Sequence, residues 1–445
     1  MPSKGTRINP RQKELSERSA PPSAAEAAAA RMSRRRKFGF RLLTIALVVL
    51  VFWGLPEAIV RWVNPPLETY RAIVFGGDSN SLQLFMKDSR LHWKLRPAVE
   101  TEFLDVTVRT DRHGFRGAPP VPGNRVVLCL GDSTTFGFRV EEADSFPGRL
   151  QSRLKISQKT ENAWSVINAG VPGYSSFQVR LLAERLVPIW NPDTIVVCVG
   201  NNEAWPVDRS DRQLDADRTM TTGVLDLLST SRFLVWGAEA IRHEQPQPFT
   251  APALETAVPR VSREEFGENL RAIAQIARAA NAKLIFLSPP VNLYWKPMRA
   301  DLVPEWKKWE SLCNTIRTTW NAGQRQKAAE IVSAAYAENP DFFIALWIKG
   351  IFLTDNGDID GGRELLEQAI EYHPFPENCK RSYREVIAEV ARQQQATYVD
   401  VNDLFRSRAP GPTPQSLYID WCHPTPQGHG IIAGALFEAI VGDQR

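Results

Sequence analysis

Five short segments with strand-like sequences constrain the fold of this chain most. They cover residues 125–130, 165–168, 194–199, 283–287 and 397–401. The first and third are uninterrupted apolar runs, which are typical of strands buried on both faces of a parallel sheet. Segments with helical spacing alternate with them, at residues 146–156, 178–186, 262–276, 381–393 and 427–441. Strands that alternate with helices predict a three-layer α/β/α domain with a parallel five-stranded sheet.

Two segments interrupt this alternation. Residues 204–260 are polar with weak periodicity, and we expect a lid-like insertion there. Residues 305–376 repeat with a period of 34 residues. The matching residues are Pro340 and Pro374, Ala335 and Ala369, and Ala328 and Gly362. Small residues at such positions let paired helices approach closely. The segment resembles two tetratricopeptide repeats, the first with a degenerate leading helix; an ordinary helical hairpin is the alternative.

The N-terminal part of the chain holds one strongly apolar run, at residues 42–55. A basic cluster precedes it, made of Arg31, Arg34, Arg35, Arg36, Lys37 and Arg41. With residues 38–41 added, the run approaches the length of a membrane span. Because basic residues stay on the cytoplasmic side, residues 1–37 are expected inside and the chain after about residue 64 outside. This predicts a single-pass protein of a bacterial inner membrane, with its main domain in the periplasm or outside the cell.

A cleaved signal peptide is the alternative for this run. The leader of 37 residues is long for a signal peptide, and Pro56-Glu57-Ala58 is a poor cleavage site. We therefore expect an uncleaved anchor over residues 38–63, preceded by a disordered basic tail. Beyond the basic cluster the net charge of +4 leaves the chain nearly neutral, so no nucleic-acid partner is expected.

The five cysteines suggest no metal or other cofactor site. No pair of them is spaced as CxxC, and none forms a cluster with histidines in the sequence. Cys129 and Cys198 fall in predicted core strands, where a free thiol behaves as a small apolar side chain. Cys313 and Cys379 flank the helical insert and are the candidates for a pair in an oxidising compartment.

A serine motif stands at the end of the first predicted strand. Gly131-Asp132-Ser133 follows that strand directly, and Gly137 comes four residues after the serine. Ligand sites of parallel sheets lie at the carboxyl ends of their strands. The same three letters recur at residues 77–79, but there they follow a short apolar stretch and lack the later glycine. We therefore select Ser133 as the candidate nucleophile.

Three further motifs fall at the same end of the sheet. Residues 168–174 (NAGVPGY) follow the second strand, residues 200–203 (GNNE) follow the third, and residues 420–424 (DWCHP) precede the last helix. Together and in this order, the four motifs resemble the sequence blocks of the SGNH (GDSL-like) hydrolase family. The resemblance covers residues 125–300 and 380–445. It implies a flavodoxin-like fold and a serine ester hydrolase.

The residue types agree with that chemistry. A serine hydroxyl needs a base to remove its proton, and His423 is the candidate, oriented by Asp420. The resemblance assigns the oxyanion hole to the backbone N–H groups of Ser133 and Gly173 and to the side-chain amide of Asn202. The simpler interpretations are a turn or capping residue for Ser133, a loop histidine for His423 and a turn residue for Asn202. No G-x-S-x-G motif surrounds Ser133, which disfavours the usual α/β-hydrolase arrangement.

One position departs from the family pattern. Glu203 stands where the third motif usually has an aspartate, which leaves the local geometry or the shape of the substrate open. Trp205 and Trp295 are candidates for stacking on a sugar, although core packing is the commoner use of tryptophan.

These features predict six regions and one main function. The regions are a tail (1–37), an anchor (38–63), a juxtamembrane segment (64–124), the first part of the hydrolase domain (125–304), the helical insert (305–376) and the last part of the domain (377–445). The predicted function is hydrolysis of acyl or acetyl esters of small molecules, or of cell-envelope glycans or lipids, through an acyl-Ser133 intermediate. The alternatives are an envelope polysaccharide O-acyltransferase with the same triad and a non-catalytic scaffold that binds a protein partner through the insert.

Overall fold

The computed structural model describes residues 24–63, 81–88, 90–157, 163–216, 231–241, 256–297, 299, 306–409, 411 and 413–442. The chain forms two compact units, one of residues 1–65 and 228–242, the other of residues 66–227 and 243–445. Three predicted features fall outside the described residues: most of the basic tail, the second Gly-Asp-Ser at 77–79, and residues 217–230 and 242–255 of the lid-like insertion.

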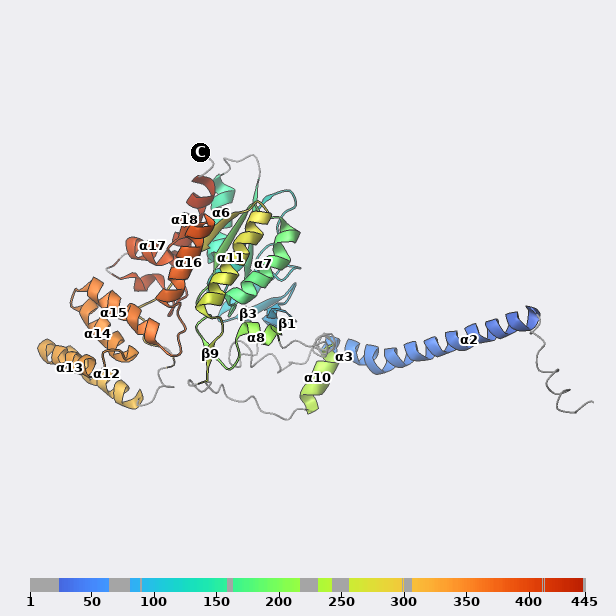
Figure 1. Ribbon diagram of the computed structural model, residues 1–445, viewed down its shortest axis with the longest axis horizontal. Helices are drawn as coiled ribbons and strands as arrows, with labels where there is room; N and C mark the ends of the chain where they lie inside the picture. The colour runs from blue at the N-terminus through green and yellow to red at the C-terminus, as the bar shows by residue number, and fades with distance from the viewer. Residues whose placement is uncertain are drawn as a thin grey trace, which may run out of the picture. The chain divides into compact units, whose positions relative to one another are not determined.

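The second unit is built on a parallel sheet of five strands (Figure 1). Its strands, in the order β11-β10-β7-β5-β6, are β11 (Thr397–Val399), β10 (Lys283–Leu287), β7 (Thr194–Cys198), β5 (Arg125–Gly131) and β6 (Trp164–Gly170). The predicted α/β fold and its five parallel strands are confirmed. The predicted fifth strand ends two residues early, because the Asp400 carboxylate accepts the backbone N–H groups of Asn402 and Asp403 and caps the next helix.

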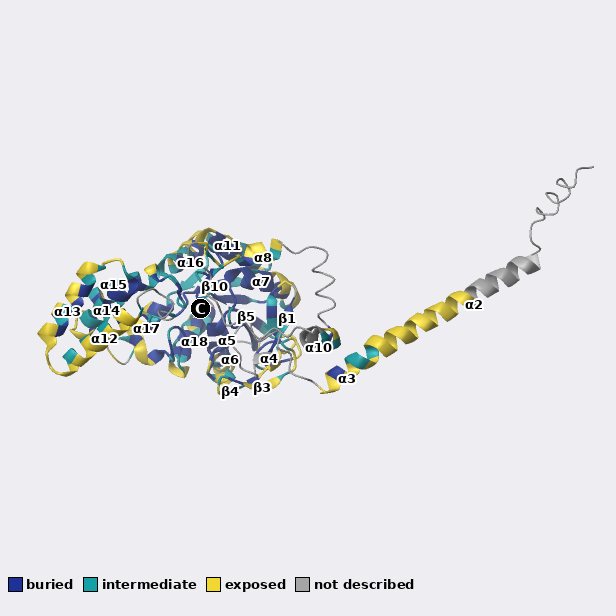
Figure 2. Ribbon diagram, turned by 90° about the horizontal axis from the view of Figure 1, so that it is seen from below, coloured by how far each residue is buried: buried dark blue, intermediate teal, exposed yellow. Residues whose placement is uncertain are grey.

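Helices cover both faces of this sheet (Figure 2). Successive strand residues pack into two different cores. Leu128, Ile195 and Phe286 face one core, which includes residues of α7 (Ser176–Trp190), α11 (Arg263–Ala279) and α16 (Arg381–Gln394). Their neighbours Val127, Val196 and Ile285 face the other core, with α6 (Phe146–Ser157), α17 (Val401–Arg408) and α18 (Pro426–Val441). Burial on both faces explains why these strands read as continuous apolar runs.

α7 is longer than the predicted helix over 178–186. Ser175 and Gln178 form a capping box that starts it at Ser176, and the helix continues through Pro188 to Trp190. The shorter elements of this unit are α5 (Ser133–Phe136), η3 (Glu142–Asp144), β8 (Pro206–Val207), α8 (Asp211–Ala216), β9 (Val258–Pro259) and η5 (Pro414–Leu417).

Residues 81–124 pack into the same core as the sheet. They form α4 (Ser81–Leu84) and two antiparallel hairpins, β1 (Phe85–Asp88) with β2 (His92–Leu95) and β3 (Glu100–Phe103) with β4 (Val106–Arg109). Arg116, which is 2% exposed, donates hydrogen bonds to the carbonyl oxygens of Phe136, Gly137 and Val140. This segment therefore supports the loop that follows Ser133, a role that the sequence pattern did not indicate.

The helical insert consists of α12 (Trp306–Asn321), α13 (Arg325–Glu338), α14 (Phe343–Asp355) and α15 (Ile359–Tyr372). α13 begins at Arg325 and α15 at Ile359, 34 residues later, which agrees with the predicted period. α14 and α15 approach closely at two glycines: a Cβ on Gly350 would lie 2.7 Å from Leu366 Cγ, and one on Gly362 would lie 2.2 Å from Thr354 Oγ1. The classification as tetratricopeptide repeats stays a prediction.

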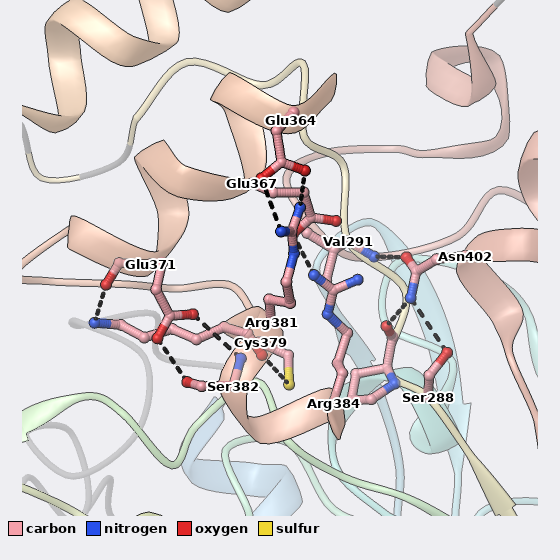
Figure 3. Close-up of polar contacts among 12 residues, drawn as sticks. Ser288, Val291, Glu364, Glu367, Glu371, Cys379, Arg381, Ser382, Arg384 and Asn402 are labelled. Carbon is pink, nitrogen blue, oxygen red and sulfur yellow. Dashed lines mark hydrogen bonds and ion pairs between the residues drawn. The ribbon is translucent and has the colours of Figure 1, made fainter. Parts of the chain in front are cut away.

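A row of ion pairs and hydrogen bonds joins α15 to α16 (Figure 3). Arg381 makes a bidentate contact to Glu364, and Arg384 pairs with the buried Glu367. The Ser382 hydroxyl donates to the Glu371 carboxylate at 2.6 Å. The insert is thereby fixed to a helix of the sheet domain by charged groups at one seam.

The first unit contains α2 (Ala24–Val49), the π-helical turn η1 (Leu50–Gly54), α3 (Leu55–Val63) and α10 (Arg232–Ile241). Among the described residues one helical stretch, Arg36–Val63, is long and apolar enough to cross a membrane, judged by length and composition alone. The π turn lies just before Pro56, whose missing N–H and bulky ring disturb the regular helical bonds. Glu57 accepts the backbone N–H groups of Arg232 and Phe233, so it caps α10.

Candidate active site

The turn after β5 places Ser133 at the carboxyl end of the sheet. A Cβ on Gly131 would lie 2.1 Å from the carbonyl oxygen of Cys198, so only glycine lets β5 and β7 lie this close there. The Asp132 carboxylate accepts the N–H of Thr134 at 2.9 Å and caps α5, as expected for a residue that fixes the loop. Gly137, with φ of +85°, ends α5 in the left-handed region. Ser133 is thus held on a rigid strand-to-helix turn.

A tight turn before α18 presents Asp420 and His423 together. The Ile419 N–H donates to the carbonyl oxygen of His423 at 2.8 Å, and the His423 N–H donates to Asp420 Oδ1 at 2.9 Å. In the same turn His423 Nδ1 lies 2.8 Å from Asp420 Oδ2. The imidazole stacks on the ring of Phe138, with centroids 4.2 Å apart. These contacts fix the plane of the ring.

The structure brings the three predicted side chains into one line. His423 Nε2 lies 2.8 Å from Ser133 Oγ, although the two residues are 290 positions apart in the chain. With Nδ1–H donated to Asp420, Nε2 is free to accept the serine proton. Burial raises the pKa of Asp420, but the bonds from the His423 side chain and from the backbone outweigh it and leave this pKa below its usual value. An ionised Asp420 stabilises an imidazolium at His423.

The loops that carry the predicted oxyanion donors start beside the serine turn. The Val171 N–H donates to the carbonyl oxygen of Gly131 at 3.0 Å, and the Asp132 N–H donates to that of Cys198, the last residue of β7, at 3.3 Å. Within the described part of the chain, the N–H groups of Ser133 and Gly173 have no acceptor. Gly173 has φ of +80°, in the left-handed region, and its carbonyl oxygen accepts from Arg260 at 2.8 Å. The Asn202 amide donates one of its two hydrogens to the carbonyl oxygen of Tyr174 at 2.9 Å. The second hydrogen remains for a substrate oxygen.

The Glu203 side chain holds the backbone of Asn202 through a hydrogen bond. Its carboxylate is fully buried and accepts the N–H of Ser176, the first residue of α7, at 2.6 Å. The other oxygen accepts the N–H of Asn202 at 3.1 Å. Burial raises the pKa of Glu203 to about 8, against these hydrogen bonds. Glu203 thus joins the start of α7 to the Asn202 loop.

Several residues that contact the candidate site are not predicted by the sequence motifs. The Asn292 side chain donates to the carbonyl oxygen of Asp420 at 2.9 Å, and its backbone N–H donates to that of Trp421 at 2.8 Å. Asn201 Oδ1 accepts the N–H of Cys379 at 3.0 Å, which connects the Asn202 loop to the segment after the insert. For Asn292, the one feature of the sequence that points to the site is its place after β10, at the edge of the sheet where the motifs lie.

Asp420, Cys422 and His423 offer ligand atoms within 4.8 Å of one another, as a metal site would. Both imidazole nitrogens, however, already face Asp420 and Ser133. Burial raises the pKa of Cys422 well above its usual value, so its sulfur is a thiol and a poor metal ligand. The geometry favours acid–base chemistry at this position over metal binding.

A second buried histidine, the cysteines and the two candidate tryptophans lie outside the triad. His429 is fully buried, its Nδ1 accepts the N–H of Phe146 at 3.1 Å, and burial lowers its pKa to about 3. All five cysteines are free thiols, so Cys313 and Cys379 form no disulfide here. Trp295 is 36% exposed, whereas Trp205 lies under the guanidinium of Arg299.

Comparisons with known proteins identify the family of this chain. The sequence model of the GDSL-like Lipase/Acylhydrolase family matches residues 129–374. Similar solved structures include a lipase/acylhydrolase from Enterococcus faecalis, at 14% identity over 72% of this chain and 96% of that one, with a TM-score of 0.37. An acetylxylan esterase from Geobacillus stearothermophilus has the same identity and coverage, with a TM-score of 0.35. Among curated proteins, none matches this chain significantly.

The family match covers more than half of the chain and includes the turn that carries Ser133. The chain therefore belongs to the GDSL-like lipase/acylhydrolase family and is an SGNH-type serine hydrolase.

Proposed function

We propose that this protein is a membrane-anchored carboxylic ester hydrolase that works through an acyl-Ser133 intermediate. The single observation that carries the proposal is the pair of 2.8 Å contacts from His423, one to Ser133 Oγ and one to Asp420 Oδ2. A serine in line with a buried imidazole and a carboxylate is the arrangement that activates a hydroxyl for acyl transfer.

The reaction follows from these contacts in two halves. Ser133 Oγ attacks the ester carbonyl while His423 Nε2 takes the serine proton, and the oxyanion is held by the N–H groups of Ser133 and Gly173 and the Asn202 amide. The bond from carbon to the alcohol oxygen then breaks, and His423 returns the proton to the departing alcohol. Water repeats the sequence on the acyl-enzyme and releases the carboxylic acid.

In this proposal the apolar helix Arg36–Val63 anchors the protein to a membrane. Arg36, Lys37 and Arg41 lie at the N-terminal end of the apolar stretch Arg36–Val63. Because basic residues stay cytoplasmic, the hydrolase domain would lie on the periplasmic or outer side of a bacterial inner membrane. An alkaline phosphatase fused after residue 445 would then be active; an inactive fusion that is present in the membrane contradicts this orientation.

The catalytic proposal is tested with the full chain in detergent. Wild type should hydrolyse para-nitrophenyl acetate and butyrate and should carry a fluorophosphonate label on Ser133. Ser133→Ala should lose both, whereas Ser79→Ala, in the same Gly-Asp-Ser letters, should keep both. A labelled Ser133 with turnover only when a sugar acceptor is added would identify a transferase. A folded wild type that takes no label would refute the covalent mechanism.

A further inference from the structure

α10 is attached to the C-terminal end of the apolar stretch by hydrogen bonds between residues far apart in the sequence. The Glu57 carboxylate accepts the N–H groups of Arg232 at 3.1 Å and of Phe233 at 2.9 Å, the latter from 176 positions away. Glu57 also accepts the Ser231 hydroxyl at 2.6 Å, and this hydroxyl in turn accepts the indole N–H of Trp53 at 3.0 Å. α10 packs against α3 in the same compact unit (Figure 1). Its first turn therefore lies at the level of Glu57.

The length of the apolar stretch sets the depth of Glu57 in a membrane. The stretch has 28 residues and is about 42 Å long, at about 1.5 Å per residue. A hydrocarbon core of about 30 Å takes up about 20 of these residues. Because the charges of Arg36 and Lys37 stay in water, the core begins near Phe38 and ends near Glu57. The first turn of α10 then lies at the boundary between the acyl chains and the headgroups.

The residues around Glu57 suit this boundary. Arg61 pairs with the Glu57 carboxylate at 2.6 Å, in addition to the hydroxyl and the two N–H groups that donate to it. A charge that is paired and hydrogen-bonded costs far less in an apolar environment than an isolated one. On α3, Ile59 is 58% exposed and Trp62 is 87% exposed. Tryptophan is enriched at membrane interfaces, so the end of the stretch has the side chains of such an interface.

α10 itself exposes apolar side chains on two sides. Two of its ten residues, Arg232 and Glu239, are charged. Leu234 is 36% exposed and Trp236 is 42% exposed. At about 100° per residue the two positions are about 200° apart around the helix, so one flat protein surface cannot cover both. Lipid can surround a helix on several sides and remove both side chains from water.

We propose that α10 is an interfacial helix, which contacts the lipid of the anchoring membrane through Leu234 and Trp236. The inference rests on the proposed anchor and goes beyond it, because it assigns a second lipid contact to a segment far from the span in the sequence. The hydrogen bonds of Glu57 hold the helix at the boundary, and its exposed apolar side chains insert between the acyl chains. The chain is then bound to the bilayer by two separate segments.

The test uses the full chain in phosphatidylcholine vesicles, with an NBD label on one introduced cysteine. Cys313→Ser is present in every protein, because the other native cysteines are buried. Leu47→Cys reports the anchor, Leu234→Cys and Trp236→Cys report the two sides of α10, and Glu330→Cys, at an exposed residue of α13, is the reference in water. Each labelled protein should unfold at the temperature of the Cys313→Ser protein.

Two quenchers measure where each label lies. A lipid nitroxide near the headgroup should quench the labels at positions 234 and 236 severalfold more than the label at 330. Iodide, added on both sides of the membrane, should quench the labels at 234 and 236 severalfold less than the label at 330. A nitroxide at the end of the acyl chain should quench the label at 47.

The outcomes separate the interfacial helix from the anchor. If the label at 47 is quenched by lipid and those at 234 and 236 behave like the label at 330, the interfacial helix is refuted and the anchor stands. Labels at 234 and 236 that are shielded from both iodide and nitroxide would show that protein covers α10, which also refutes the lipid contact. If no lipid nitroxide quenches the label at 47, the anchor fails; lipid quenching at 234 and 236 then still supports α10 as a membrane contact, and its absence refutes it.

Discussion

The carboxyl edge of the sheet and the helical insert bury polar groups in different ways. Around Ser133 the buried carboxyl groups of Asp132, Glu203 and Asp420 each accept backbone N–H groups, the two aspartates within their own turns and Glu203 from the first residue of α7. In α12 to α15 the buried residues are mainly apolar or small, and the one buried carboxylate, among the residues described there, is Glu367 at the seam with α16. The polar groups of the site are thus joined mainly to the backbone, whereas those at the seam of the insert form ion pairs between side chains.

Because of this difference, substitutions in the two regions should have different effects. A change at the sheet edge should alter the reaction while the fold persists, because each loop has several hydrogen bonds besides the one removed. A change at the seam should alter stability, because a buried charge that loses its partner has few alternatives. Four variants test this separation.

The largest effect is expected for Asp420→Asn. The amide cannot stabilise the imidazolium and turns His423 to the wrong tautomer, so kcat for para-nitrophenyl acetate should fall about 10⁴-fold. Unfolding should occur near the wild-type temperature. Asp403→Asn, an exposed aspartate of α17, is the matched control and should have wild-type kcat. A fall of less than tenfold for Asp420→Asn would argue against its role.

Arg384→Met should have the next largest effect, on stability. It leaves the buried Glu367 with Arg381, 3.9 Å away, as its one ion-pair partner among the described residues, and should lower the free energy of unfolding by about 3 kcal/mol. The double variant with Glu367→Met should recover much of that loss. Arg392→Met, which breaks the exposed pair with Glu389, should change stability far less. If Arg384→Met and Arg392→Met lower the free energy of unfolding equally, the seam is no more sensitive than the surface.

Asn202→Ala should act on the reaction alone. Loss of one oxyanion donor lowers kcat about 10²-fold with little change in KM. The variant also loses the bond to the Tyr174 carbonyl, so its thermal unfolding should be measured beside the kinetics. A purely raised KM would show that Asn202 binds the substrate in its ground state instead.

The smallest effect is a dependence of stability on pH. Glu203 has a folded-state pKa of about 8, above its ordinary value of 4.5, so it favours folding while protonated. That contribution is complete below about pH 4.5 and is lost as pH rises through about 8. The unfolding temperature should therefore fall between about pH 4.5 and 8 and change little above that, and the fall should be smaller in Glu203→Gln. Glu330→Gln, an exposed glutamate of α13, should keep the wild-type slope. If the unfolding temperatures of wild type, Glu203→Gln and Glu330→Gln depend on pH with the same slope, Glu203 is not neutral in the folded protein.

The sheet could be predicted because its strands are buried on both faces. β10 has the predicted bounds at both ends, since its apolar run is continuous and lies between a helix and a turn. The hairpins of residues 85–109 could not be predicted, because their strands have only four residues each. Short strands carry too little periodicity to be distinguished from loops.

The residues of the candidate site could also be predicted only in part. Ser133, His423 and Asp420 could be selected because each stands in a motif with a fixed place relative to a strand or helix. The contacts of Asn292 with Asp420 and of Asn201 with Cys379 span 128 and 178 residues and follow no motif. Neighbours of this kind are fixed by tertiary packing alone.

The hydrogen bond between Cys379 and Asn201 has a consequence for heat tolerance. It connects the exit of the insert to the residue beside the Asn202 amide, at a 3.0 Å separation. Melting of α14 and α15 would remove this one hydrogen bond from the Asn202 loop while the sheet is still intact. The highest temperature at which the enzyme is active is then set by whichever of the insert and the sheet melts first. If the insert melts first, activity falls while the sheet is still folded.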